Sequence, residues 1–219
     1  MPAKNILKDY VAEAYYHLYN RGVAKQGIFL DEEDYKKFIG YLKIYLTVPD
    51  LQGRTLKVSP SRKLNNYTEK IKLLSYCLMP NHFHLFIWQK GENSITDFMR
   101  SLGTKYAGYF NKKYQRIGPV FQGRYKAVMV TTEPQFIYLS KYIHRNPLDI
   151  LPSRTDLEGY KYSSYQNYLQ RFNQTWVNTE EIMSYFSKTN PGESYKKFVE
   201  EVDESDILRI KNLTLDIEQ

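Results

Sequence analysis

The chain lacks the features that mark several classes of protein. Cys77 is the only cysteine in 219 residues, so no intramolecular disulfide can form, which argues against a disulfide-stabilised secreted domain. No run of about 18 apolar residues could form a membrane-spanning helix. The N-terminal stretch "MPAKNILKDYVAEAYY" has no apolar core of the signal-peptide kind. We therefore expect a cytoplasmic protein that does not contact a membrane, with Cys77 as a buried thiol.

Histidine and tryptophan are scarce, whereas tyrosine and basic residues are abundant. The chain has four histidines and two tryptophans, but 21 tyrosines, and its net charge is +7. Residues 100–147 hold nine Lys or Arg and one acidic residue, whereas residues 176–219 hold five basic and ten acidic residues. A basic segment favours an anionic partner, and tyrosines can stack on planar ligands. The segment 100–147 is therefore the predicted anion-binding region, and the acidic segment a solvated helical surface.

The spacing of apolar residues predicts an α+β fold. Asp31 is the expected N-cap of a first helix, a second helix starts near Ser94, and "TEPQ" at 132–135 is a capping box that starts a third, which ends before Pro147. The strands are expected at 14–20, 71–79, 82–89 and 124–131, the middle two forming a hairpin around Pro80-Asn81. The order β–α–β–β–α–β, followed by a helix, predicts a ferredoxin-like sandwich with an antiparallel sheet and both crossover helices on one face.

The domain organisation is predicted to be a catalytic domain with a helical extension. The catalytic domain is expected to span 1–150, interrupted by a long loop at 48–68 that contains prolines and glycine. Residues 151–219 are expected to form a helical C-terminal extension that packs on it. Its short helices are predicted in "YSSYQNYLQ", "TEEIMSYF" and "SYKKFVEEV".

Two histidines in "PNHFHLFI" are the first candidates for chemistry. Residues two apart in a strand point to the same face, so His82 and His84 project together while Phe83 enters the opposite layer. Neutral imidazoles at this spacing can bind one metal ion. A His-x-His pattern alone is more often a pair of half-exposed histidines, so further residues have to support the metal site.

The third predicted helix supplies that support in "TEPQFIYLSKYIHRNP". Tyr142 and Asn146 are four residues apart and share a helix face. A tyrosine hydroxyl and an amide oxygen on one face, combined with the histidine pair, suit phosphoryl transfer with a metal that stabilises developing charge. Tyr138, one turn earlier on nearly the same face, is the main alternative nucleophile, and Tyr142 could instead be a core tyrosine.

Four motifs in order resemble a known family. "YHLYNRG" (16–22), "YCLMPNHFHLFI" (76–87), "GPVFQGRYKAVMV" (118–130) and "YIHRNP" (142–147) are similar to the single-tyrosine HUH transposases, and most of all to the REP-associated tyrosine transposases. The resemblance runs from about Tyr15 to Pro147. It implies a ferredoxin-like core, the metal ligands His82, His84 and Asn146, the nucleophile Tyr142, and Mg²⁺ or Mn²⁺ as cofactor.

The implied reaction is cleavage and rejoining of single-stranded, hairpin-forming repeat DNA through a 5′-phosphotyrosine intermediate. The alternatives are a nucleic-acid-binding protein without catalysis, or a metal-dependent hydrolase that uses activated water. His17 and His144 are expected outside the metal site. The oligomeric state is left open between monomer and homodimer. The expected DNA-binding residues are Lys105, Lys112, Lys113, Arg124, Tyr125, Lys126 and Arg145.

Overall fold

The computed structural model describes residues 10–48, 65–152 and 154–201. Most of the predicted loop at 48–68 and the end of the acidic C-terminal region lie outside these residues. Among the described residues, no helix combines the length and the apolar character needed to cross a bilayer.

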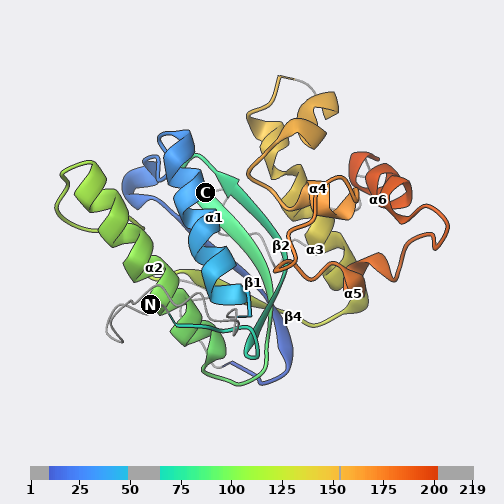
Figure 1. Ribbon diagram of the computed structural model, residues 1–219, viewed down its shortest axis with the longest axis horizontal. Coiled ribbons are helices and arrows are strands. Elements are labelled where there is room, and N and C mark those ends of the chain that lie inside the picture. The colour runs from blue at the N-terminus through green and yellow to red at the C-terminus, as the bar shows by residue number, and fades with distance from the viewer. Residues whose placement is uncertain (1–9, 49–64, 153, 202–219) are drawn as a thin grey trace, which may run out of the picture.

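The predicted order of strands and helices is confirmed (Figure 1). All four strands pair antiparallel in the order β2-β3-β1-β4, so β1 and β3 occupy the centre. Helices α1 and α2 lie on one face of the sheet, while α3 lies on the other face with the C-terminal helices (Figure 1). The elements of this core are β1 (Ala14–Arg21), α1 (Glu32–Leu46), β2 (Ile71–Met79), β3 (His82–Gln89), α2 (Ser94–Lys113), β4 (Lys126–Val130) and α3 (Glu133–Arg145).

Helix α1 starts as predicted, whereas the start of α3 differs in one detail. Asp31 caps α1, and it forms a reciprocal capping box with Asp34. At α3 the Thr132 side chain accepts a hydrogen bond from the backbone N–H of Gln135, as a capping box requires. The Gln135 side chain, however, accepts from the backbone N–H of Thr131 at 2.9 Å. The predicted box is therefore only half formed, because the glutamine closes the turn one residue further back.

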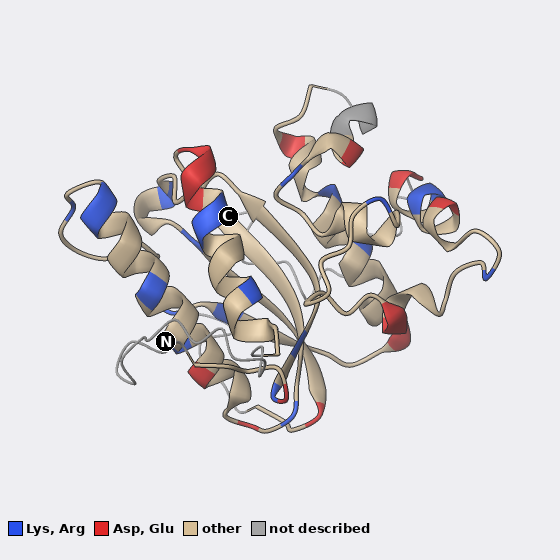
Figure 2. Ribbon diagram, in the orientation of Figure 1, with Lys and Arg blue, Asp and Glu red and all other residues tan. Residues whose placement is uncertain are grey.

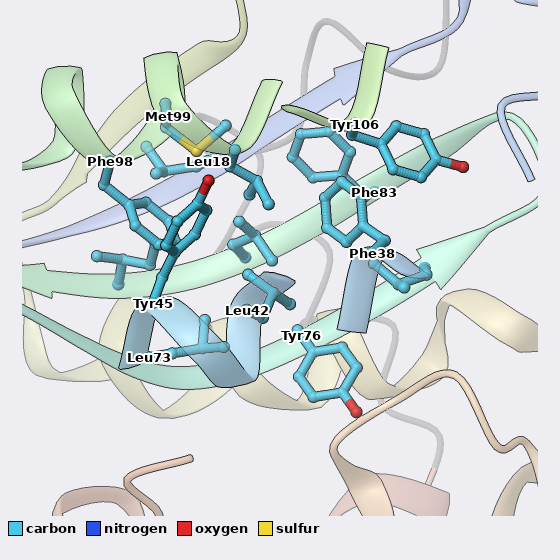
Figure 3. Close-up of a cluster of buried hydrophobic side chains, with 14 of the residues drawn as sticks. Leu18, Phe38, Leu42, Tyr45, Leu73, Tyr76, Phe83, Phe98, Met99 and Tyr106 are labelled. Atoms are coloured by element: carbon cyan, nitrogen blue, oxygen red, sulfur yellow. The ribbon is translucent and has the colours of Figure 1, made fainter. Parts of the chain in front are cut away.

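The sheet is apolar on both faces and separates two cores. Phe83, Leu85 and Ile87 of β3 face α1 and α2, where Figure 3 shows the ring of Phe83 near Phe38 and Tyr106. The alternate face of the same sheet packs against α3 and the C-terminal segment through Phe86, Cys77 and Leu74. Cys77 is a buried thiol, as predicted. The position of α3 is therefore fixed by a core of its own.

The C-terminal segment covers the edge strand β2. Ser163 forms a β-bridge with Cys77, and Val177 forms another with Leu73. These pairings satisfy part of an edge that would otherwise expose its backbone groups. The division of the chain at residue 150 stays a prediction. The elements of this segment are η3 (Asn146–Asp149), η4 (Arg154–Gly159), α4 (Tyr165–Tyr168), α5 (Glu180–Met183) and α6 (Pro191–Glu200), while the short helix η1 (Val23–Lys25) follows β1.

Candidate active site

Strand alternation places the two histidines of β3 as the sequence predicts. Phe83 is buried in the α1–α2 core, whereas His82 and His84 lie on the opposite face, with their rings 5.0 Å apart. His84 is paired with Tyr19 of β1 on one side and with Cys77 of β2 on the other. Because β3 is a central strand, the positions of both imidazoles are fixed by neighbours on two sides.

His84 is held by a histidine from the neighbouring strand. Its ring is completely buried, and its Nδ1 atom lies 2.9 Å from Nε2 of His17, which is also buried. The two rings stack with their centroids 5.1 Å apart. His17 is therefore the neighbour that stacks on the ring of the predicted ligand His84, and the Nε2 atom of His17 points at His84. This contact fixes the orientation of the His84 imidazole and directs Nε2 away from His17.

His82 is held in a similar way by the turn that precedes it. The side-chain oxygen of Asn81 accepts a hydrogen bond from Nδ1 of His82 at 2.6 Å, and the Asn81 amide nitrogen donates to the carbonyl of Lys25. With the proton on Nδ1, the lone pair of His82 resides on Nε2. The charge of Asp149, in the short helix after α3, acts on the same imidazole and favours its protonated form.

The Nε2 atoms of both histidines are buried and have no hydrogen-bond partner among the described residues. Burial lowers the pKa of His82, and it lowers the pKa of His84 to well below its ordinary value, with further contributions from His82 and His17. Both imidazoles are therefore neutral near pH 7. A buried nitrogen lone pair without a partner is costly in a folded protein, and ligation of a metal ion would satisfy it.

Asn146 lies where the predicted third ligand is needed. Asn146 directly follows α3 and is 9% exposed, and its side-chain amide nitrogen donates to the carbonyl of Tyr142 at 2.9 Å. The Asn146 side chain is close enough to His82 and His84 to oppose the lowering of both pKa values by burial. Because its nitrogen points back along the helix, the amide oxygen is the atom that can take part in ligation.

Tyr142 lies against the histidines, and its alternative Tyr138 packs against a C-terminal helix. The ring of Tyr142 meets the His84 ring edge-on, with the centroids 5.5 Å apart, and the His17 ring at 6.0 Å. The ring of Tyr138 packs against Phe198 of α6 at 5.2 Å. The structure therefore places the ring of Tyr142 beside His84 and the ring of Tyr138 beside Phe198, which favours Tyr142 as the nucleophile.

The donor set fits a divalent metal ion. Among the described residues, no three His, Cys, Asp or Glu side chains are grouped so that they could hold a metal ion. The candidate donors are therefore the two imidazole nitrogens and the Asn146 amide oxygen. Imidazoles alone would also suit Zn²⁺, whereas amide and phosphate oxygens are ligands that Mg²⁺ and Mn²⁺ accept.

His144 has a structural role in the core between the sheet, α3 and the C-terminal segment. It is predicted to lie outside the metal site. Its two ring nitrogens share hydrogen bonds with the hydroxyls of Tyr195, at 2.7 Å, and Ser164, at 2.8 Å. Burial lowers the pKa of His144 to about 3, so the ring is neutral. Both nitrogens are thus used to join α3 to the C-terminal segment.

The predicted DNA-binding residues have different surroundings, and Figure 2 shows basic residues along α2 and acidic ones at the start of α1. Lys105 and Lys112 are exposed on α2. Lys113 instead forms ion pairs with Asp31, Glu33 and Asp34, at 2.7 to 3.1 Å. These contacts favour a role for Lys113 in joining α1 to α2, and we leave it out of the proposed interface.

The remaining four residues divide between the two faces of the sheet. Lys126 pairs with Tyr19, whose ring lies on the histidine side. Arg145 donates a hydrogen bond to the carbonyl of Val199 in α6 at 2.7 Å, which ties it to the C-terminal segment. Arg124 and Tyr125 line a cavity beside α2. Residues that are close together in the basic segment 100–147 therefore do not all lie on one surface of the structure.

Sequence reasoning missed three residues around the histidines. His17 is predicted to lie outside the metal site, and the register of β1 against β3 brings it into contact with His84, which is 67 residues away in sequence. The sequence predicts Asn81 only as a turn residue, and no sequence pattern singles out Asp149. The one signal in the sequence is that His17 and Tyr19 are two residues apart and therefore share one face of a strand. This signal points to the site only once that strand is known to lie beside β3.

Comparisons with known proteins find a matching family and similar solved structures. Residues 58–146 match the family described as "Transposase IS200 like". The comparison with curated proteins finds no match. Among solved structures, a REP-associated tyrosine transposase bound to a REP hairpin is similar at a TM-score of 0.53, with 12% sequence identity, over 75% of this chain and 84% of that one. A proposed transposase from Deinococcus radiodurans R1 has a TM-score of 0.38 and 16% identity, over 64% of this chain and 95% of that one.

The matched segment includes most of the candidate site. Residues 58–146 contain both histidines, Tyr142 and Asn146, whereas His17 and Asp149 lie outside it. The resemblance inferred from the four motifs is therefore confirmed. Residues 58–146 match the IS200-like transposase family, and the fold of the chain is similar to that of a REP-associated tyrosine transposase.

Proposed function

We propose that the protein is a transposase that cleaves and rejoins single-stranded, hairpin-forming DNA with Tyr142 as its nucleophile. The observation that carries the proposal is the pair of buried Nε2 atoms without partners, next to the ring of Tyr142. The match to IS200-like transposases supports DNA as the substrate, and the hairpin in the similar solved structure supports a folded single strand. We expect this reaction to take place in the cytoplasm.

In the proposed reaction the phenolic oxygen of Tyr142 attacks a phosphodiester. A bond forms between this oxygen and phosphorus, and the bond from phosphorus to the 3′ oxygen breaks. The phenol loses its proton to solvent, and the departing 3′ oxygen gains one. The products are a 5′-phosphotyrosine link and a free 3′-hydroxyl. The phosphodiester is exchanged rather than hydrolysed, so the reverse attack by a 3′-hydroxyl rejoins a strand without ATP.

The residues around Tyr142 prepare the site for this exchange. His82, His84 and Asn146 would hold Mg²⁺ or Mn²⁺, which supplies positive charge that polarises the phosphate and stabilises the developing negative charge. Asn81 and His17 keep the imidazoles oriented with Nε2 towards the site. The hydrogen bond from the Asn146 side-chain amide to the backbone carbonyl of Tyr142 holds the nucleophile and the third ligand in one helical turn.

A covalent-adduct assay tests the proposal. The protein is incubated with a 5′- and 3′-labelled hairpin oligonucleotide and Mn²⁺, and adducts are separated on a denaturing gel. We expect a protein–DNA adduct that is lost in Tyr142→Phe and kept in Tyr138→Phe, the matched control on the same helix. His82→Ala should also abolish the adduct without preventing DNA binding.

The other two hypotheses give different results in the same assay. Cleavage without an adduct, unchanged in Tyr142→Phe, would indicate hydrolysis by activated water. Binding of the hairpin without any cleavage would indicate a nucleic-acid-binding protein. An adduct that depends on Tyr138 would overturn the assignment of the nucleophile but keep the reaction type.

A further inference from the structure

Arg21 is a cationic residue beside the candidate active site to which the reaction described above gives no role. It is the last residue of β1 and belongs to the motif "YHLYNRG". The register of β1 against β3 pairs it directly with His82. Because alternate residues of a strand share a face, Arg21 lies on the same side of the sheet as His17. The candidate site therefore has a guanidinium group next to one of its proposed metal ligands.

The position of Arg21 is fixed by hydrogen bonds to two other segments. Its carbonyl accepts from the backbone N–H of Gln122, and the N–H of Gly22 donates to the carbonyl of Asn81, both at 2.8 Å. No side chain fits at Gly22, because a Cβ there would lie 2.0 Å from the carbonyl oxygen of Gln26. The side chain of Arg21 is held as well, since its Nε donates to the side-chain oxygen of Gln122 at 2.7 Å. Both the backbone and the guanidinium are therefore in place before a substrate binds.

The charge of Arg21 has no counter-ion within the described parts of the chain. The residue forms no ion pair there, and Nε is the only guanidinium nitrogen with a hydrogen-bond partner. Burial is the main cause of the lowered pKa of His82, and the charge of Arg21 lowers it further. An arginine whose charge reaches a metal-binding imidazole and is not paired points to an anionic ligand.

The charges around His82 favour a phosphate as that anion. Both imidazoles are neutral, so the site would gain two positive charges with a divalent ion, and Arg21 adds a third. The carboxylate of Asp149 also acts on His82 and offsets one of them. Like charges this close are unfavourable unless an anion lies between them. A phosphodiester fits, because its two non-bridging oxygens can face the metal ion and the guanidinium at the same time.

We propose that Arg21 is a catalytic residue whose guanidinium contacts a non-bridging oxygen of the phosphate that Tyr142 attacks. This inference rests on the proposed function, since it requires a phosphodiester at that position. Arginines that hold a transferring phosphoryl group stabilise the charge on its oxygens in the transition state. Because Gln122 binds Nε, the two Nη groups are the donors that face the phosphate. The guanidinium therefore acts on the rate of attack more than on the affinity for DNA.

The variants for the test separate charge from donor geometry. Arg21→Gln removes the charge and keeps a polar side chain, whereas Arg21→Lys keeps the charge and loses the planar set of donors. Arg116→Gln is the matched control, because it removes an arginine that lies over the ring of Phe110, which belongs to the α1–α2 core. All are made in the full-length chain, and thermal unfolding confirms that they are folded.

Three quantities are measured for each protein. They are the rate of adduct formation with saturating hairpin oligonucleotide and Mn²⁺, the dissociation constant of the hairpin, and the affinity for Mn²⁺ without DNA. We expect Arg21→Gln to lower the rate by about 100-fold or more, the order found for loss of one group that stabilises transition-state charge. Arg21→Lys should lie between it and wild type, and Arg116→Gln should react at the wild-type rate.

The two affinities separate catalysis from binding and from support of the fold. The dissociation constant of the hairpin should change little in Arg21→Gln, because only one of several phosphate contacts is lost. The affinity for Mn²⁺ should be unchanged or higher, because a positive charge near the ion is removed. A structural role of Arg21 in holding His82 would instead lower the affinity for Mn²⁺ together with the rate.

The possible failures lead to different conclusions. If wild type forms the adduct and Arg21→Gln forms it at the same rate, Arg21 is not catalytic and the proposed function is unaffected. A loss confined to hairpin affinity would make Arg21 a binding residue, and a parallel loss of Mn²⁺ affinity would make it a structural one; both overturn the proposal. If wild-type protein forms no adduct, the role of Arg21 and the proposed function are both overturned.

Discussion

The Nδ1 atom of His84 lies 2.9 Å from Nε2 of His17, and both rings are fully buried. If Nε2 of His84 carries the lone pair for a metal ion, its Nδ1 carries the proton and donates to His17. Partners of this kind fix the tautomer and orientation of a ligand histidine, and their loss commonly costs 10- to 100-fold in metal affinity by order of magnitude, that is about 1–3 kcal/mol.

We therefore predict that His17→Leu weakens Mn²⁺ binding by roughly tenfold or more, whereas His17→Gln, which can place an acceptor oxygen near the same position, retains most of it. Isothermal titration calorimetry with Mn²⁺ and no DNA measures the effect independently of catalysis. His144→Gln serves as the control, since it perturbs another buried histidine whose nitrogens bond to Tyr195 and Ser164. Equal affinities for Mn²⁺ in wild type and His17→Leu would contradict the assigned role.

The contact between His17 and His84 illustrates what the sequence can predict and what it cannot. Alternation in "PNHFHLFI" requires only local geometry, so the common direction of His82 and His84 was predictable, as was the burial of Phe83 on the other face. The contact between His17 and His84 depends on the register of two strands separated by 67 residues, which no local pattern determines. The resemblance implies Tyr142 as the nucleophile, whereas the packing of Tyr138 against Phe198, a residue of a helix far along the chain, follows only from the structure.

Asn146 is predicted to act as an oxygen ligand at the end of α3. Asn146→Ala removes the amide oxygen, so we expect the affinity for Mn²⁺ to fall by about tenfold, or roughly 1.4 kcal/mol. Asn146→Asp keeps an oxygen and adds negative charge, so it should bind Mn²⁺ at least as tightly as wild type, although it loses the hydrogen bond donated to the Tyr142 carbonyl. Titration of Mn²⁺ followed by electron paramagnetic resonance distinguishes the two. A variant Asn146→Ala with wild-type affinity would remove this residue from the metal site.

Asp34 is predicted to make stability depend on pH in the acidic range. Burial raises the pKa of this carboxyl, but ion pairing with Lys113 and hydrogen bonds from Leu30, Tyr114 and Tyr109 outweigh it, and the net shift is downward. A carboxyl whose pKa is lower in the folded than in the unfolded state stabilises the fold above its unfolded pKa, which is near 4, and this stabilisation is lost as the pH falls through the folded pKa.

Asp34→Asn should therefore lower the free energy of unfolding by about 2 kcal/mol at pH 7, the order expected for hydrogen bonds to a charged group. The difference from wild type should shrink below pH 4. Urea unfolding at pH 7, 5 and 3.5 measures it. Asp31→Asn is the control, because this carboxylate is half exposed and its loss should cost much less. A wild-type and an Asp34→Asn protein that lose stability in parallel with falling pH would show that Asp34 does not contribute.

Ser164 is predicted to bind the C-terminal segment to the sheet strongly enough that the chain unfolds as one unit. Its hydroxyl accepts a hydrogen bond from the backbone N–H of Tyr76 at 2.9 Å and shares one with Nε2 of His144 at 2.8 Å. Because these groups are buried, Ser164→Ala leaves both without this partner, which costs about 2 kcal/mol. We expect the melting temperature to fall by about 4–8 °C in a single transition.

Ser184→Ala, which removes an exposed hydroxyl bonded to the Glu181 carbonyl, is the control and should change the melting temperature little. If Ser164→Ala instead produced two separate transitions, the C-terminal segment would be a unit that unfolds independently. The core between the sheet, α3 and this segment would then not be what holds Tyr142 against the histidines.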